Sequence, residues 1–288
     1  MTYVDEAFEK CKSTLNVTKT ETSFASSKHQ DIRSVVRDTW ELDDDFLTGS
    51  YRRETKTKRL KDVDIFVVLK PGGAQAGLRK QPPTQVLRQL EQVLSNRYDH
   101  ISSDGFACTV QFGSEDEVAS FDVVPAFKRT TTGWEIPDAD RGRWISTNPK
   151  RHHEYCTKKN AECDGRFVPF VKMIKGINRQ AEEPIQPPFL LEVMAYELIQ
   201  APFGRYQDEI RWFLATAGDR ITEDWADPAG IGPDVNEQMT SSQRQQVRTV
   251  LLEWLEISEE AVRLEDDGQE RSAVEEWRRL FGWRMPRP

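Results

Sequence analysis

The hydrophobic positions of the chain follow two different periods. β-branched and aromatic residues fill most of positions 63 to 68, and apolar residues between 106 and 112 alternate with small or polar ones. Both patterns are typical of strands, and residues 118 to 124 are predicted to form another. Helices are predicted over residues 2–17, 22–39 and 83–97, and from residue 149 onward the sequence is almost wholly helical.

The order of these elements predicts an α+β fold. We expect a mixed or antiparallel sheet flanked by helices, rather than the repeated strand-helix-strand units of a parallel α/β protein. The expected division places residues 1–145 in a strand-rich domain with N-terminal helices, and residues 146–288 in a helical C-terminal domain. Because pockets are common at domain interfaces, we expect the functional site in the cleft between the two domains.

Two aspartates at the start of a predicted strand are the first candidates for chemistry. Residues two apart on a strand point to the same face, so Asp62 and Asp64 should stand side by side. Neighbouring carboxylates repel each other, but a bound divalent cation keeps both ionised. Mg²⁺ prefers a few carboxylates together with phosphate oxygens and water. Taken alone, however, the pair is better explained as part of a solvent-facing strand edge, where Asp-x-Asp is common.

The segment before this strand indicates an anion site. Gly49 lets backbone N–H groups approach an anion, and Ser50 adds a hydroxyl. Residues 51–61 contain six basic residues and one acid, Glu54, in a chain whose formal net charge is -8. This stretch is therefore a local concentration of positive charge, and we expect Arg53 within it to contact a phosphate.

A third carboxylate is expected on a neighbouring strand, because two-metal phosphoryl transfer needs a further ligand. Asp122 meets this requirement, since an acid flanked by apolar residues in a strand is costly unless it is paired or bound to a metal. It is a better candidate than the acidic clusters within 41–45 and 265–270. The alternative is an aspartate that only caps a turn before Pro125.

Composition narrows the class of protein. The chain is 37% hydrophobic and 31% charged, has no run of about 18 apolar residues and begins without a signal-peptide pattern. Its four cysteines show no disulfide framework, so we expect a cytoplasmic protein without membrane contact. Proteins that bind nucleic-acid backbones usually carry a broad basic face. The net negative charge of this chain therefore disfavours constitutive nucleic-acid binding.

The order of Gly-Ser, Asp-x-Asp and a later single Asp resembles the DNA polymerase β-type nucleotidyltransferase superfamily. More narrowly, the segments Gly49-Ser50-Tyr51-Arg52-Arg53 and Asp62-Val63-Asp64-Ile65 resemble the bacterial CD-NTases, and residues 277–286 are similar to the ending of clade D. These relatives of cyclic GMP-AMP synthase make cyclic oligonucleotide signals in CBASS anti-phage defence. The resemblance covers nearly the whole chain.

The resemblance implies a polymerase β-like core in which Asp62, Asp64 and Asp122 are the catalytic and metal-binding residues. They would hold two Mg²⁺ ions, with Mn²⁺ as a possible substitute, and Gly49 and Ser50 would bind the triphosphate of an NTP. It also implies that Lys175, with Lys172 one turn before it, contacts the triphosphate, and that Phe189 stacks on a base. The alternative interpretations are that Lys172 and Lys175 are exposed helix residues and that Phe189 is a core residue.

The implied reaction condenses NTPs, with ATP expected, into a cyclic di- or trinucleotide and releases pyrophosphate. The implied partners are an activating or regulatory protein from the same operon and a downstream effector that receives the product. Three alternatives stay open: a template-independent RNA nucleotide-adding enzyme, an AMP transferase to another acceptor, and an inactive nucleotide-binding protein.

Two further groups leave alternatives open. His152, His153, Cys156 and Cys163 are zinc-ligand types in one segment. They lack the paired Cys-x-x-Cys spacing of structural zinc sites, so zinc is not expected, and both cysteines are also suited to a helix core. Asn148 precedes Pro149 and is either a base-reading residue or an ordinary helix start.

Overall fold

The computed structural model describes residues 2–113 and 118–288 and divides the chain into two compact units. One unit contains the sheet and consists of Val17–His153 and Ala229–Pro233. The other is helical and consists of the segment up to Asn16, Glu154–Pro228 and Asp234–Pro288. The sequence-based division placed residues 1–145 in one domain and residues 146–288 in the other, whereas in the structure the segment up to Asn16 groups with the helices.

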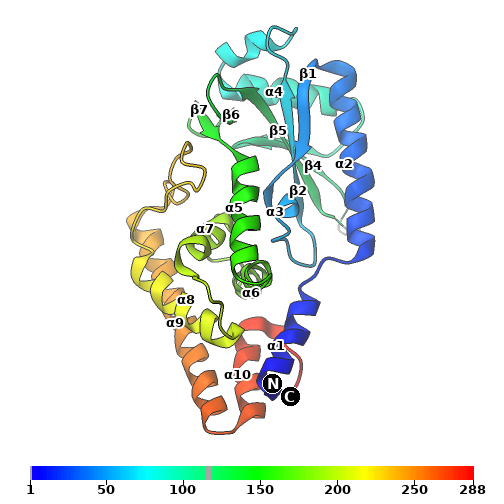
Figure 1. Cartoon of the computed structure of the whole chain (residues 1–288). Helices are drawn as coiled ribbons and strands as arrows, with labels where there is room; N and C mark the ends of the chain where they lie inside the picture. The colour runs from blue at the N-terminus through cyan, green and yellow to red at the C-terminus, as the bar shows by residue number, and fades with distance from the viewer. Residues whose placement is uncertain (1, 114–117) are drawn as a thin grey trace. The chain divides into compact units, whose positions relative to one another are not determined.

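The sheet unit is built on a mixed sheet whose main strands lie in the order β1 (Leu42–Leu47), β2 (Asp62–Leu69), β5 (Ser120–Lys128), β4 (Ala107–Gln111) and β3 (Ile101–Asp104). β6 (Trp134–Asp138) pairs with β5, and β7 (Arg143–Thr147) pairs with β6. β2 and β5 run parallel, whereas the other described pairs are antiparallel. The expected mixed sheet flanked by helices is confirmed (Figure 1).

Alternation along β2 separates its two faces. Val63, Ile65 and Val67 belong to the core that includes residues of α2 (Lys19–Thr39) and α4 (Pro83–Leu94), so these helices cover one face of the sheet. Asp62 and Asp64 point to the opposite face, because successive side chains on a strand alternate. A short helix α3 (Gly49–Arg52) precedes β2, and a 3-10 helix η1 (Ala76–Lys80) follows it.

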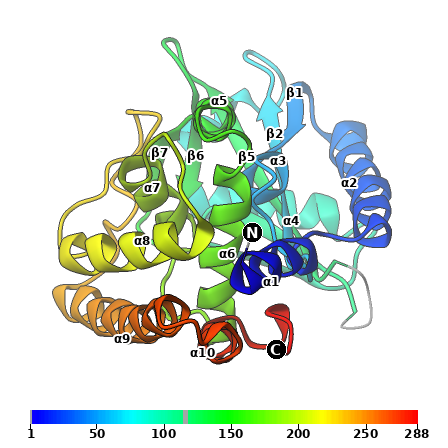
Figure 2. The same ribbon diagram turned by 60° about the horizontal axis from the view of Figure 1, so that its bottom comes forward.

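The helical unit contains α1 (Tyr3–Thr14), α6 (Phe167–Gln180), α7 (Phe189–Leu198), α8 (Tyr206–Arg220), α9 (Ser241–Asp266), α10 (Glu270–Phe281) and the short η2 (Gly282–Arg284). Helix α5 (Pro149–Glu162) begins in the sheet unit and ends in the helical one. Helix α1 lies beside α10 (Figure 2). In α1, the ring centroid of Phe8 lies 5.1 Å from that of Trp277 and 5.8 Å from that of Phe281. This aromatic packing explains why the N-terminal segment belongs with the C-terminal helices.

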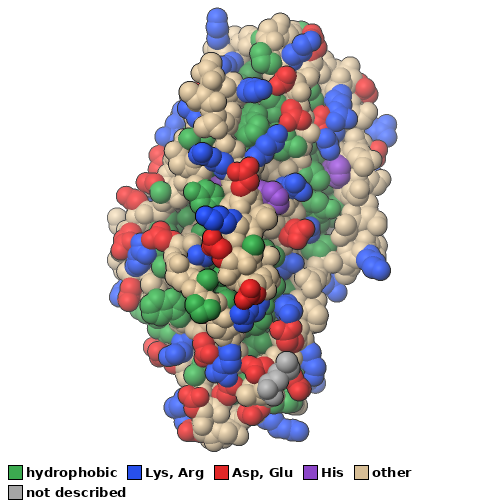
Figure 3. Space-filling view, in the orientation of Figure 1, with side chains coloured by type: hydrophobic (Ala, Val, Ile, Leu, Met, Phe, Trp, Pro, Cys, Tyr) green, Lys and Arg blue, Asp and Glu red, His purple; other side chains and the backbone are tan. Residues whose placement is uncertain are grey.

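Acidic and basic side chains are interspersed over the face of the molecule that Figure 3 shows, without one broad basic area. Among the described residues, no helix combines the length and the apolar composition needed to cross a bilayer.

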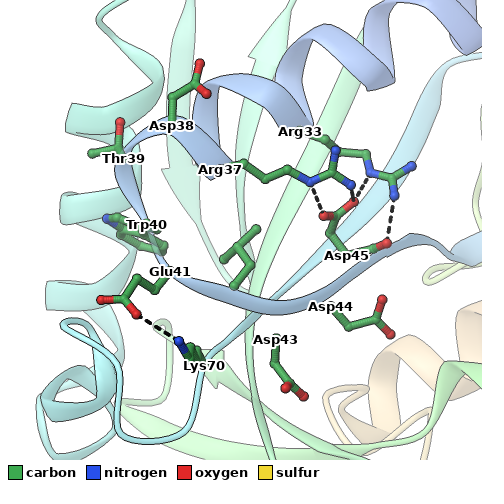
Figure 4. Close-up of a pocket in the computed structure, with 11 residues that line it drawn as sticks. Arg33, Arg37, Asp38, Thr39, Trp40, Glu41, Asp43, Asp44, Asp45 and Lys70 are labelled. Atoms are coloured by element: carbon green, nitrogen blue, oxygen red, sulfur yellow. Dashed lines mark hydrogen bonds and ion pairs between the residues drawn. The ribbon is translucent and has the colours of Figure 1, made fainter.

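Strand β1 has a sequence that does not predict a strand, because three of its six residues are aspartates. Arg33 and Arg37 of α2 stabilise it through Asp45, whose side chain is only 4% exposed (Figure 4). Arg33 Nε and Arg37 Nε donate to the carboxylate, Arg37 Nη2 donates to Oδ1 at 2.7 Å, and Arg33 Nη2 donates to the Asp45 carbonyl at 2.7 Å. The two guanidinium groups therefore bind both the charge and the backbone of this strand.

Removing both guanidinium groups should destabilise the sheet unit strongly. In the Arg33→Ala/Arg37→Ala variant, Asp45 remains buried without these cations, and we expect the free energy of unfolding to fall by about 3–5 kcal/mol. Urea denaturation followed by circular dichroism measures this loss. The control is Lys70→Ala, which breaks the neighbouring pair with Glu41 whose side chains are 56% and 52% exposed. We expect this control to lose about 0–1 kcal/mol, and equal losses in the two variants would contradict the assigned role of Asp45.

Candidate active site

Three carboxylates meet on the face of the sheet that α2 and α4 leave uncovered. Asp62 and Asp64 are two apart on β2, and the parallel register places Asp64 directly beside Asp122 of β5. One oxygen from each carboxylate lies within 4.8 Å of the others, and all three side chains are half-buried. In the part of the chain that the structure describes, no other group of three or more His, Cys, Asp or Glu side chains is gathered in this way.

The donor set fits a hard divalent cation. Mg²⁺ and Ca²⁺ prefer carboxylate oxygens, and three such oxygens in one place bring together like charges that a cation would stabilise. Because Mg²⁺ usually keeps several water or phosphate ligands, three carboxylates are sufficient for magnesium-dependent phosphoryl chemistry. The structure thus brings together the three acids that the sequence singled out.

Gly49 lies against this cluster. Its φ of +62° favours glycine, and a Cβ atom built on it would lie 1.6 Å from Oδ2 of Asp64. The backbone N–H of Thr48 donates to the Asp64 carbonyl at 3.0 Å, which holds the turn next to β2. The glycine is therefore required both for the backbone conformation and for the space that the Asp64 carboxylate occupies.

Two other candidate phosphate-binding residues, Ser50 and Arg53, lie near this turn and differ in how far they are buried. Ser50 is half-buried in α3, and its carbonyl accepts the N–H of Thr55 at 3.1 Å. Arg53 follows α3 and is only 7% exposed, with its backbone N–H bound to the Gly49 carbonyl. A guanidinium this enclosed has little freedom to move, and its contact with a phosphate stays a prediction.

One polar neighbour of the cluster carried no signal in the sequence. Thr109 on β4 is paired with Asp122, and its hydroxyl donates to Oδ1 of Asp122 at 2.7 Å. A threonine is ordinary in a strand, so only the pairing of β4 with β5 shows that this one contacts a functional carboxylate.

The predicted triphosphate lysines lie in the helical unit. Lys175 Nζ on α6 is 2.9 Å from Oε1 of Glu192 on α7, and the Glu192 side chain is fully buried. Tyr196 donates a longer hydrogen bond of 3.4 Å to the other Glu192 oxygen. Lys172 Nζ instead donates to Oδ1 of Asn16 at 2.9 Å. Of the two lysines, Lys175 is the one whose position is determined by a buried charge.

Phe189 is half-buried at the start of α7 and packs against the core of the helical unit. Its packing role is therefore present in the structure, while base stacking stays a prediction. Asn148 accepts the N–H of Arg151 at 3.1 Å and donates to Thr132 Oγ1 at 3.3 Å, so its role as a helix start is confirmed.

Of the four possible zinc ligands on and after α5, the two cysteines are packing residues. Cys156 and Cys163 are buried in the hydrophobic core of the helical unit, which confirms the core interpretation of both. Burial raises the pKa of the Cys163 thiol and so favours the neutral form over the thiolate that zinc binds. His152 is mostly buried, and His153 is half-buried.

Comparison with known proteins now identifies the family. Residues 1–160 match the Second Messenger Oligonucleotide or Dinucleotide Synthetase (SMODS) domain. The chain belongs to this family. Its resemblance to the CD-NTases and the expected class of enzyme, a nucleotidyltransferase that makes an oligonucleotide or dinucleotide second messenger, are therefore confirmed.

Relatives in the curated proteins agree with this membership. The chain is 26% identical over 273 residues to a probable cyclic nucleotide synthase of Bacillus cereus. This alignment covers 83% of this chain and 81% of the relative. It is also 26% identical over 261 residues to a cyclic AMP-AMP-AMP synthase of Acinetobacter sp., with 84% and 72% of the two chains covered.

Solved structures show the same fold at lower identity. E. coli CdnC with ATP superposes with a TM-score of 0.74 at 15% identity, and 98% of each chain is covered. The Bradyrhizobium diazoefficiens CD-NTase CdnG with GTP has a TM-score of 0.73 at 14% identity, covering 96% of this chain and 99% of that one. The expected polymerase β-like α+β fold is confirmed.

A methyl group at Gly49 should disable the site. In Gly49→Ala, the added Cβ must displace the Asp64 carboxylate, so we expect NTP turnover to fall by about 100-fold or more with the helix content unchanged. Release of pyrophosphate from NTPs measures turnover, and circular dichroism checks the fold. Gly72→Ala is the matched control, because Gly72 has a similar φ of +74° but nothing within 4 Å of its Cβ position. If Gly49→Ala were as active as Gly72→Ala, the close contact with Asp64 would have no functional importance.

Proposed function

We propose that this chain condenses NTPs into a cyclic di- or trinucleotide and releases pyrophosphate, as a signal in CBASS anti-phage defence. The observation that carries the proposal is the cluster of Asp62, Asp64 and Asp122 beside Gly49, in a chain of the second-messenger synthetase family. Template-independent addition to RNA would use the same three acids but receives no support from the charge of the chain, which is -8.

The three carboxylates suit two Mg²⁺ ions, and Mn²⁺ is an acceptable substitute. When bound, such ions supply Lewis-acid stabilisation of the phosphoryl oxygens and lower the pKa of the attacking ribose hydroxyl. The role of the chain is to hold Asp62, Asp64 and Asp122 in one place and to present them to the triphosphate from a rigid sheet. Catalysis then arises mainly from positioning and electrostatics.

The other proposed contacts hold the nucleotide. The backbone at Gly49, the Ser50 hydroxyl and the Arg53 guanidinium are suited to the phosphates, because they combine N–H donors with a positive charge. Lys175 and Lys172 are proposed to neutralise the β- and γ-phosphates. Phe189 is proposed to stack on a base through the part of its ring that remains exposed, since it is only half-buried.

ATP is the proposed main substrate. The Acinetobacter relative is named a cyclic AMP-AMP-AMP synthase, and the similar E. coli CdnC structure contains ATP. A regulatory protein from the same operon is a proposed partner, supported by a complex of E. coli CdnC with a HORMA protein, and a downstream effector would receive the product. We place the reaction in the cytoplasm, where NTPs are available.

Incubation with the four NTPs and Mg²⁺ or Mn²⁺, followed by mass spectrometry and linkage-specific nuclease digestion, tests the reaction. We expect a cyclic product and pyrophosphate from the wild type, tested with and without its neighbouring operon proteins. In Asp62→Asn/Asp64→Asn, we expect product to be abolished with the fold retained. Asp44→Asn is the control, because it removes a nearby strand carboxylate that is outside the cluster. Normal turnover by the double variant would refute the assignment.

The two lysines can be separated by their effects on nucleotide binding. Lys175→Met alone would leave Glu192 buried without its ammonium partner, so the informative variant is Lys175→Met/Glu192→Gln. We expect this variant to raise the KM for ATP by about 10-fold or more, since a charge-assisted phosphate contact is worth about 1.5–3 kcal/mol. Lys172→Met is the comparison and should have a smaller effect. An unchanged KM in the Lys175 variant would remove that residue from the proposed site.

A further inference from the structure

The pairing of β4 with β5 places a hydroxyl beside one of the three acids. On β4, Cys108 and Val110 are fully buried in the core beneath the sheet, so Thr109 between them must point to the opposite face. Asp122 lies on that same face, directly across from Thr109 in the antiparallel register. Cross-strand neighbours of this kind have Cβ atoms about 4.5–5.5 Å apart, which is within reach of a hydrogen bond between short side chains.

The hydrogen bond has a definite direction. The Thr109 hydroxyl donates to Oδ1 of Asp122 at 2.7 Å, a normal length for a bond from a hydroxyl to a carboxylate. Threonine is β-branched and therefore stiff at χ1, so the strand backbone largely determines where its oxygen lies. A carboxylate held at one oxygen by a fixed donor loses most of its rotation about the Cβ–Cγ bond.

The other two acids are oriented differently. Asp62 and Asp64 are neighbours on one strand, and Asp64 is confined on one side by the backbone at Gly49. Asp122 comes from a different strand, so its carboxylate must be turned toward the other two by its own surroundings. The hydroxyl of Thr109 is in the right place to do this.

We propose that Thr109 is a positioning residue for the metal site: its hydroxyl holds Oδ1 of Asp122 and so orients this carboxylate toward Asp62 and Asp64. Thr109 contacts neither substrate nor ion in this role. It acts through Asp122 and sets the affinity of the cluster for divalent cations. The inference rests on the proposed metal-dependent function and names a residue that determines how well that site is formed.

The test compares three substitutions at one position. Thr109→Val has nearly the same shape and a high strand propensity but no donor, whereas Thr109→Ser keeps the hydroxyl. Titration with Mn²⁺ alone, followed by electron paramagnetic resonance, measures binding without relying on turnover. We expect Thr109→Val to weaken Mn²⁺ binding by about 10–100-fold, as is typical for residues that orient metal ligands, and Thr109→Ser to bind nearly as well as the wild type. Thr109→Ala serves as a second donor-free variant if the valine variant folds poorly.

Each outcome separates the inference from the proposed function. Mn²⁺ binding by Thr109→Val and Thr109→Ala equal to that of the wild type, while Asp62→Asn/Asp64→Asn loses the ion, overturns the role of Thr109 and leaves the metal site intact. Unchanged Mn²⁺ binding by Asp62→Asn/Asp64→Asn overturns the proposed metal site itself. Equal weakening in the serine and valine variants would mean that packing, and not the hydroxyl, is responsible, and would also overturn the inference.

Discussion

The parallel pairing of β2 with β5 is the constraint on which the candidate site depends. It places Asp64 beside Asp122 and brings three carboxylates to one place, although like charges repel. The opposite face of the same two strands carries fully buried residues such as Val63, Ile65 and Val123, which pack against helices. Burial of these apolar side chains supplies the free energy that keeps the strands, and therefore the acids, in register.

Two buried carboxylates elsewhere in the chain are stabilised in a different way. Asp45 is enclosed by two arginines, and the buried Glu192 holds Lys175, so in both places opposite charges offset the cost of burial. The cluster on β2 and β5 gathers charges of the same sign. This contrast is the physical basis for interpreting the cluster as a cation site and the two ion pairs mainly as structural contacts. One of these ion pairs also holds Lys175 in a defined position.

Family membership and geometry contribute separate parts of the functional conclusion. Membership in the synthetase family establishes the class of product, a second-messenger oligonucleotide or dinucleotide. The geometry supports the proposed site residues: acids on two strands, a glycine that leaves room for one of them, and a threonine that donates a hydrogen bond to another. In its proposed role, Thr109 contributes to this site through Asp122 without touching the nucleotide.

The sequence alone determined the features that follow from local patterns. The sequence predicted a strand within β2, and helices within a few residues of the bounds of α1, α2 and α4, because periodicity and strand propensity act over short distances. The two aspartates on one face, the glycine before them and the third acid at position 122 were predicted for the same reason, with the family resemblance adding their roles.

Only the tertiary structure decided the features that depend on distant partners. Strand β1 is rich in aspartate and exists because arginines of α2 bind it, and the short strands β3, β6 and β7 form because neighbouring strands pair with them. α1 joins the C-terminal helices through aromatic packing that no local pattern reveals. Thr109 acquires its importance in the same way, because the register between β4 and β5 is set by the burial of one whole sheet face and not by the residues around position 109.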